Sequence, residues 1–137
     1  MAVADLISGR YKLTESDNFD EFLAAIGLGY IKRKIVQSTS PEMEIIQEGD
    51  EEWRIITSSA LSTSEVRFKL GEEFEEKRQD GVTVTSLVVA EGDDKWVYTQ
   101  KPGDGKDVIS TREYKDTHLM VTNCIGDVTS TRTYERL

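Results

Sequence analysis

The spacing of hydrophobic residues along this chain changes once, near Pro41. Upstream of that residue, apolar side chains recur every three or four positions, which is the spacing of one face of an α-helix. They are Phe19, Phe22, Leu23 and Ile26. The pattern predicts two short helices joined by a tight turn over residues 18–38, and neither carries a basic face long enough to read DNA.

The ends of the first helix carry their own signals. Asn18 is followed three positions later by Glu21, a spacing that predicts a capping box, in which each side chain bonds a free backbone N–H at the start of the helix. Gly27 suits the end of that helix, because glycine readily takes the left-handed conformation that is common there.

The second helix carries a further apolar stripe of Leu28, Ile31 and Ile35. We expect this stripe to repeat the pattern of the first helix and the polar residues of the second helix to face elsewhere. Those polar residues are Lys32, Arg33, Lys34 and Gln37.

Downstream of Pro41, apolar and polar residues alternate with the period of a β-strand. Val66, Phe68 and Leu70 show this alternation, and threonine and valine fill residues 82–89. Turn signals recur at Gly71, Gly81, Gly92 and Gly103, at steps of 10 or 11 residues. Because residues 9–16 also alternate, we predict one strand, two helices and then about nine strands. Such an antiparallel meander either closes as a barrel or folds as a sandwich.

The last predicted strand has two different faces. One face is uniformly polar and consists of Thr129, Thr131, Thr133 and Glu135. If it meets solvent, then Val128, Arg132 and Tyr134 point inward. An inward arginine is costly unless an internal acid or an acidic ligand pairs with it. The alternation by itself leaves open the other possibility, an Arg132 that lies outside.

Length and charge narrow the class of protein. A chain of 137 residues suits one domain, here residues 1–137, with its own core. Its 17 basic and 26 acidic residues give a net charge of −9, which disfavours nucleic-acid binding. Cys124 is the sole cysteine, which fits a reducing compartment. We find neither a signal-peptide pattern nor an apolar run long enough for a membrane span, so we expect a cytoplasmic protein.

The residues that could support catalysis are few. His118 is the sole histidine, and we expect it to lie apart from Cys124. No catalytic triad, zinc-ligand spacing or phosphate-binding loop is present in the sequence. We therefore expect no catalytic residues, no metal and no cofactor.

Several segments resemble a known family in the same order and spacing. The first is Gly9-x-Tyr11-x-Leu13, continued by Asn18-Phe19-Asp20-x-Phe22-Leu23-x-x-Ile26; later come residues 68–76, Asp80-Gly81 and Thr131-Arg132-Thr133-Tyr134. Together they resemble the intracellular lipid-binding family, which includes fatty-acid-binding proteins and cellular retinoid-binding proteins. The resemblance implies an all-β fold, a ten-stranded antiparallel up-and-down β-barrel with a two-helix cap that encloses a ligand cavity.

The resemblance also implies a binding site. Arg112, Arg132 and Tyr134 match the residues that hold a ligand carboxylate, and this match favours an inward Arg132. The positions that would line the ligand tail are Phe19, Phe22, Leu23, Ile26, Pro41, Leu61, Gln79, Asp80, Val121 and Asn123. Three of them depart from the family pattern: Phe22 stands where many members have tyrosine, Leu61 replaces a phenylalanine at the entrance, and Asn123 adds an amide at an often apolar position.

The function implied is the non-enzymatic binding and transport of a long-chain fatty acid by a monomer. A carrier of retinoic acid is the alternative, because that branch also uses two arginines and a tyrosine. The resemblance places the second helix over the opening through which a ligand leaves. There, Lys32, Arg33 and Lys34 are either a solvated helix face or a transient contact for anionic membranes.

Overall fold

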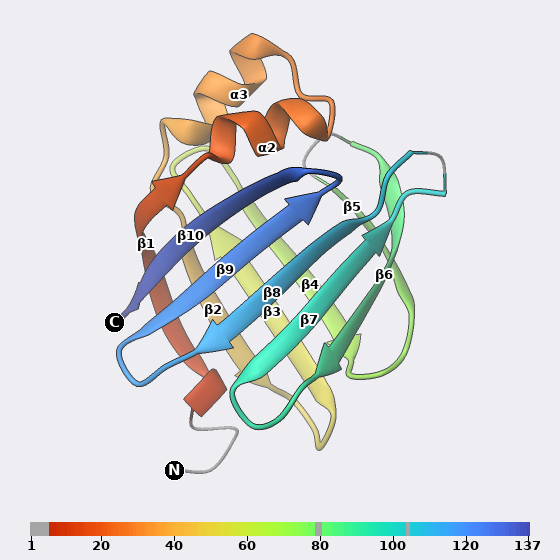
Figure 1. Ribbon diagram of the computed structural model, residues 1–137. Coiled ribbons are helices and arrows are strands. Elements are labelled where there is room, and N and C mark those ends of the chain that lie inside the picture. Colours follow the sequence, from red (N-terminus) through yellow and green to blue (C-terminus); the bar gives the residue numbers. More distant parts are fainter. Residues whose placement is uncertain (1–5, 79–80, 104) are drawn as a thin grey trace.

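The computed structural model describes residues 6–78, 81–103 and 105–137. These residues form a single ten-stranded antiparallel sheet, and two helices cover one end of it (Figure 1). The elements are β1 (Gly9–Asp17), α2 (Phe19–Ala25), α3 (Tyr30–Gln37), β2 (Glu42–Gln47), β3 (Glu52–Ser58), β4 (Thr63–Lys69), β5 (Phe74–Lys77), β6 (Thr83–Ala90), β7 (Lys95–Lys101), β8 (Val108–Tyr114), β9 (His118–Ile125) and β10 (Val128–Arg136).

The sheet closes almost completely on itself. Its strand order is β4-β3-β2-β1-β10-β9-β8-β7-β6-β5, so strands that follow one another in the sequence pair, except β4 and β5, and β1 also pairs with β10. The edge strands β4 and β5 are not paired with each other, but Phe68 and Phe74 stack there with ring centroids 5.5 Å apart. This architecture confirms the predicted up-and-down barrel and excludes the sandwich.

The alternation predicted for the last strand is present. Ser130, Arg132 and Tyr134 of β10 are buried, whereas Thr129 and Glu135 are exposed. A strand sends successive side chains to opposite faces, so the threonine face lies outside and Arg132 lies inside.

An aromatic cluster fills part of the barrel interior. Trp96 of β7 is 1% exposed, and its ring meets those of Trp53 and Tyr114 edge-on at centroid distances of 4.9 and 5.3 Å. Edge-to-face contacts of this kind add to the free energy gained from burial. The cluster joins strands β3, β7 and β8 across the interior.

Helix α2 packs directly on the barrel. Phe19, Phe22 and Leu23 are buried, and they share a cluster with Val108 of β8 and Ile125 of β9. The predicted helical stripe is therefore the face that covers the barrel end. Gly27, with φ of +103°, turns the chain after this helix, in a conformation that strains residues with a Cβ atom.

The predicted capping box at Asn18 is wrong. Asn18 has φ 58° and ψ 26°, and its side chain makes no capping hydrogen bond. Its amide nitrogen instead donates to the carbonyl oxygen of Thr129 at 2.8 Å. Capping requires extended backbone at this position, so a left-handed Asn18 directs its side chain to β10.

The stripe predicted for the second helix differs from the structure in one residue. Leu28 is buried but precedes α3, while Ile31 and Ile35 are 74% and 47% exposed. The polar residues Arg33 and Gln37 face α2 instead, where both bond Asp20. Helix α3 therefore rests on α2 and shows its apolar stripe to solvent.

Within the described residues, no helix is long and apolar enough to cross a membrane.

Candidate ligand-binding site

The three residues predicted to hold a carboxylate lie on the inner wall formed by β8, β9 and β10. The register pairs Val121 of β9 with Arg112 on one side and Arg132 on the other. Neighbouring strands are about 4.8 Å apart, so the Cα atoms of the two arginines are separated by about 10 Å. Tyr134 lies on the same face of β10, next along from Arg132. The fold thus brings all three residues to one region of the interior.

Arg132 is a buried cation with little polar support. Its side chain lies beneath α2, with the guanidinium carbon 3.8 Å from the centroid of the Phe19 ring and 6.0 Å from that of Tyr134. The residue is 7% exposed, and its Nε atom has no hydrogen-bond partner among the described residues. Burial lowers the pKa of Arg132 below its usual range, because the charged form loses hydration.

Arg112 reaches across the interior toward β2. Its Nη1 atom donates to the sulfur of Met43 at 3.2 Å, and its guanidinium carbon lies 5.7 Å from the centroid of the Tyr98 ring. A thioether is a weak acceptor. Arg112 Nε has no hydrogen-bond partner in the described part of the chain. Burial raises the pKa of Tyr114, and the nearby Arg112 guanidinium partly offsets this effect.

The two arginines share one electrostatic feature. Among the ion pairs of the described residues, none includes Arg112 or Arg132. Guanidinium groups carry five N–H donors in a planar fork that fits a carboxylate, and Tyr134 can add a hydroxyl donor. This part of the wall therefore suits an anion with a flat, two-oxygen head.

Most positions predicted for the ligand tail are buried. Four of them come from α2 and the residue that follows it, one precedes β2 and two lie on β9: Phe19, Phe22, Leu23, Ile26, Pro41, Val121 and Asn123. Leu61 lies in the turn between β3 and β4 and is 61% exposed. The predictions for Gln79 and Asp80 fall outside the described residues.

The interior holds a second polar group that the sequence patterns did not predict. Glu76 of β5 accepts hydrogen bonds from Ser86 of β6 and from Tyr98 and Gln100 of β7. Glu76 ends the acidic segment of residues 72–76. The alternation along β6 could have indicated a polar group in the interior, because Ser86 occupies an inward position between the buried residues Val84 and Val88.

Asn123 belongs to a polar row beside the arginine row. Its Oδ1 atom accepts a hydrogen bond from Ser110 Oγ at 2.6 Å, and the register pairs Asn123 with Ser110 on one side and Ser130 on the other. The interior wall therefore offers amide and hydroxyl groups next to the two cations.

The three helix cations differ in their surroundings. Lys32 and Lys34 are exposed, whereas Arg33 donates to Asp20 Oδ1 at 3.1 Å and to the carbonyl oxygen of Leu28 at 2.8 Å. Hydrogen bonds from Gln37 and Arg33 lower the pKa of Asp20, because they favour its charged form. Arg33 thus fastens α3 to α2, and two of the three cations remain available at the surface.

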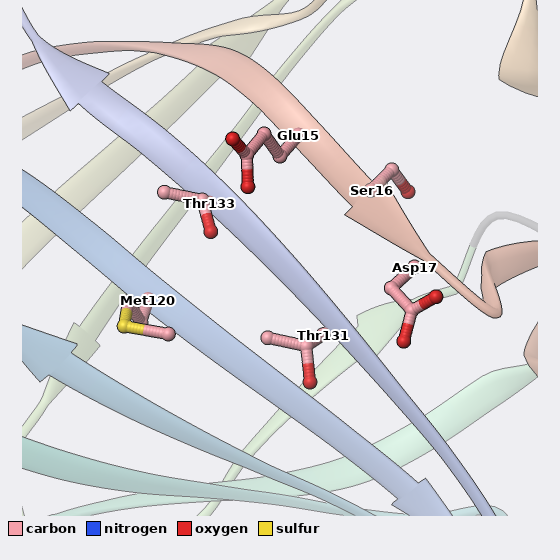
Figure 2. Close-up of a pocket in the computed structure, with 6 residues that line it drawn as sticks. All are labelled: Glu15, Ser16, Asp17, Met120, Thr131 and Thr133. Atoms are coloured by element: carbon pink, nitrogen blue, oxygen red, sulfur yellow. The ribbon is translucent and has the colours of Figure 1, made fainter.

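The outer wall carries a groove of about 540 Å³ beside β1 and β10. Figure 2 shows its lining, which consists of Glu15, Ser16, Asp17, Met120, Thr131 and Thr133. Acids and hydroxyls dominate this lining, so it suits neither a hydrocarbon nor an anion.

A smaller pocket of about 230 Å³ lies between the helices and β1 and is lined in part by Phe19 and Arg132. In the described ranges, no group of three or more His, Cys, Asp or Glu residues could hold a metal ion.

Known proteins with similar sequences and folds share this architecture. The family model described as "Lipocalin / cytosolic fatty-acid binding protein family" matches residues 8–137. A fatty acid-binding protein of Tyrophagus putrescentiae is 48% identical over 130 residues, which cover 95% of this chain and 97% of that protein. Cellular retinoic acid-binding protein 2 of Homo sapiens is 42% identical over 134 residues, covering 94% and 96%.

A solved structure agrees with these sequence matches. The fatty acid binding protein of Schistosoma mansoni in complex with arachidonic acid superimposes with a TM-score of 0.92, at 31% sequence identity and 99% coverage of both chains. The nearly closed ten-stranded barrel, its two-helix cap and a family match along almost the whole chain lead to one conclusion. This chain belongs to the lipocalin and cytosolic fatty-acid-binding protein family.

Proposed function

We propose that this protein binds a long-chain fatty acid inside the barrel and carries it without altering it. The observation that carries the proposal is the pair of inward guanidinium groups, Arg112 and Arg132, which form no ion pair within the described residues. A ligand carboxylate would supply the missing acid, and Tyr134 would donate to the same head. The name of the Tyrophagus relative and the arachidonic acid bound by the Schistosoma protein support this choice of ligand.

The energetics suit a carrier. A chain of about fifteen methylene groups gains roughly 12 kcal/mol on burial, at about 0.8 kcal/mol per group. Association costs about 4–15 kcal/mol, so the charged contacts of the head bring the dissociation constant into the micromolar to nanomolar range. The hydrocarbon thus drives binding, while the arginines select and orient the acid.

The remaining parts of the proposal concern setting and chemistry. We infer a monomeric, cytosolic carrier without a cofactor. The name of the matched family refers to binding, which supports a carrier.

Retinoic acid is the second candidate ligand. It presents the same carboxylate on an apolar body, and the 42% identity to cellular retinoic acid-binding protein 2 favours considering it. Competition between a long-chain fatty acid and retinoic acid for the same protein would rank the two ligands.

The first test compares ligands that share one hydrocarbon tail and differ only in the polar head group. We expect a saturated long-chain acid to bind one-to-one in a calorimetric titration. Its methyl ester and the matching alcohol should bind at least about tenfold more weakly, because they lack the charged hydrogen bonds to Arg112 and Arg132. Equal affinity for acid and ester would contradict the proposed site.

Delivery to membranes is a further part of the proposed function. Successive residues of an α-helix are rotated by about 100°, so Lys32 and Lys34 flank the exposed stripe of Ile31 and Ile35, and Arg33 points the opposite way. Apolar side chains flanked by lysines suit a brief contact with an anionic bilayer. Arg33 is therefore left out of the proposed membrane contact, and its proposed role is to hold α3 against α2.

The test of this contact is the rate of ligand transfer to vesicles. Replacing Lys32 and Lys34 by glutamine should slow transfer to anionic vesicles about fivefold or more at low salt, because each cation near the surface contributes about 1 kcal/mol. Equilibrium affinity for the ligand should stay unchanged. The control replaces Lys12 and Lys115, which are exposed on the barrel. Transfer that ignores vesicle charge and concentration would mean that the ligand leaves through water.

A further inference from the structure

Glu76 carries an acidic group on the inner side of an edge strand. Along β5, Phe74 and Glu76 are half-buried and Glu75 and Lys77 are exposed, so Glu76 shares the face of Phe74. Phe74 packs against Tyr98, with ring centroids 6.2 Å apart. The carboxylate therefore points to the same interior as the arginines, from strand β5.

Three donors converge on a single oxygen of this carboxylate. Ser86 Oγ donates to Glu76 Oε2 at 2.6 Å, Gln100 Nε2 donates to it at 3.2 Å, and the Tyr98 hydroxyl donates to it as well. Ser86 is completely buried and Tyr98 is 7% exposed, so the donors are held in place by the packed wall. Glu76 Oε1 accepts no hydrogen bond from the described residues and forms no ion pair with them.

Tyr98 connects this acidic group to the arginine site. Its hydroxyl bonds Glu76, while its ring lies 5.7 Å from the Arg112 guanidinium carbon. Burial and the neighbouring Glu76 raise the pKa of Tyr98, so the tyrosine stays a hydroxyl donor. If Arg112 holds the ligand carboxylate, the hydrocarbon chain of the ligand would therefore pass Glu76 at a distance that the Tyr98 side chain spans.

The chemistry of the free oxygen selects a partner. A carboxylate accepts hydrogen bonds and donates none, so Oε1 needs a donor. A second carboxylate on the ligand would be repelled, and a cation would lose its hydration close to the Arg112 charge. A neutral hydroxyl meets the requirement at a low desolvation cost. A plain hydrocarbon at the same place would leave Oε1 without a partner.

We propose that Glu76, Ser86, Tyr98 and Gln100 form a second polar site in the barrel, which binds a hydroxyl group on the chain of the carried acid. The preferred ligands are thus hydroxylated long-chain acids, with the hydroxyl in the half of the chain nearer the carboxylate. This inference rests on the proposed function, because it takes the acid head to be at Arg112 and Arg132.

The experiment titrates the full-length protein by calorimetry with three kinds of saturated C18 acid. They are the plain acid, a series of hydroxy acids with the hydroxyl moved along the chain, and the matching methoxy acids, which accept a hydrogen bond but cannot donate one. The best hydroxy acid should bind about tenfold more tightly than its methoxy counterpart, the difference expected for a hydrogen bond to a charged group. This comparison uses the unmodified protein and needs no folded variant.

Single substitutions then test whether Glu76 causes the preference for hydroxy acids. Glu76→Gln should abolish the preference for hydroxy over methoxy acid. Glu75→Gln, on the outer face of the same strand, should leave all three affinities unchanged. If the unmodified protein binds hydroxy and methoxy acids equally at every position, the inference is overturned and the cluster only ties β5 to β6 and β7. If none of the acids binds, the proposed function itself has failed.

Discussion

Arg132→Leu is expected to weaken fatty-acid binding while leaving the barrel folded. The loss should be about 1–3 kcal/mol, or roughly 5- to 150-fold in the dissociation constant, because a charged hydrogen-bonding partner of the carboxylate is removed. Titration calorimetry with one long-chain acid measures this loss. The plain alcohol should lose less, since it has no carboxylate for the arginine to hold.

The stability of the ligand-free protein should respond in the opposite direction. Arg132 is 7% exposed without an acidic partner in the described ranges, and burial of an unpaired cation costs several kcal/mol. Its contact with the Phe19 ring, at 3.8 Å, returns about 2 kcal/mol. Leucine keeps apolar packing against that ring. We therefore expect an unchanged or higher midpoint of denaturant unfolding.

A matched control is available on the outer surface. Arg10→Leu also replaces an arginine on a strand, but the Arg10 side chain is 62% exposed and pairs with Glu42. Exposed ion pairs contribute about 0–1 kcal/mol, so this variant should change neither binding nor stability much. If Arg132→Leu unfolded the ligand-free protein, Arg132 would be a structural residue and the carboxylate site would lie elsewhere.

Trp96→Ala is expected to cause the largest loss of stability. Trp96 is 1% exposed and contacts the rings of Trp53, Phe68 and Tyr114 edge-on at 4.9, 5.7 and 5.3 Å. Removing a buried aromatic side chain typically costs about 3–5 kcal/mol, through lost burial and the cavity left behind. That is a large part of the 5–15 kcal/mol that stabilises an ordinary domain.

Equilibrium unfolding in denaturant measures this loss. The control is Leu61→Ala, because Leu61 is 61% exposed and its truncation should change the free energy of unfolding by less than about 0.5 kcal/mol. A loss below about 1 kcal/mol for Trp96→Ala would show that the aromatic cluster is not the main packing centre of the barrel.

Several features of the protein were determined by the sequence alone. Regular turns and the period-two pattern predicted an antiparallel meander, and the family resemblance selected the barrel over the sandwich. The helical spacing of Phe19, Phe22 and Leu23 predicted the face of α2 that covers the barrel. The alternation of β10 left the direction of Arg132 open, and the resemblance to the lipid-binding family favoured the inward direction that the structure shows. Predictions of strands succeed because alternation is a property of the strand itself.

Other features were decided by contacts between distant segments. The outward stripe of α3 depends on Asp20, which lies on α2 and draws Arg33 and Gln37 toward it. Spacing shows that a helix has an apolar face, but it does not show which neighbour that face meets. Asn18 likewise bonds Thr129, a residue 111 positions away, in place of its own helix.

Glu76 shows most clearly that the tertiary structure determines which residues surround a side chain. In the sequence, Glu76 ends a run of glutamates that is typical of a solvated turn. The barrel places Ser86, Tyr98 and Gln100 around it from two other strands, at sequence separations of 10, 22 and 24 residues. Local patterns determined which residues face inward. Only the closure of the sheet decided which inward residues meet, because hydrogen bonds across strands depend on register and curvature that no short segment contains.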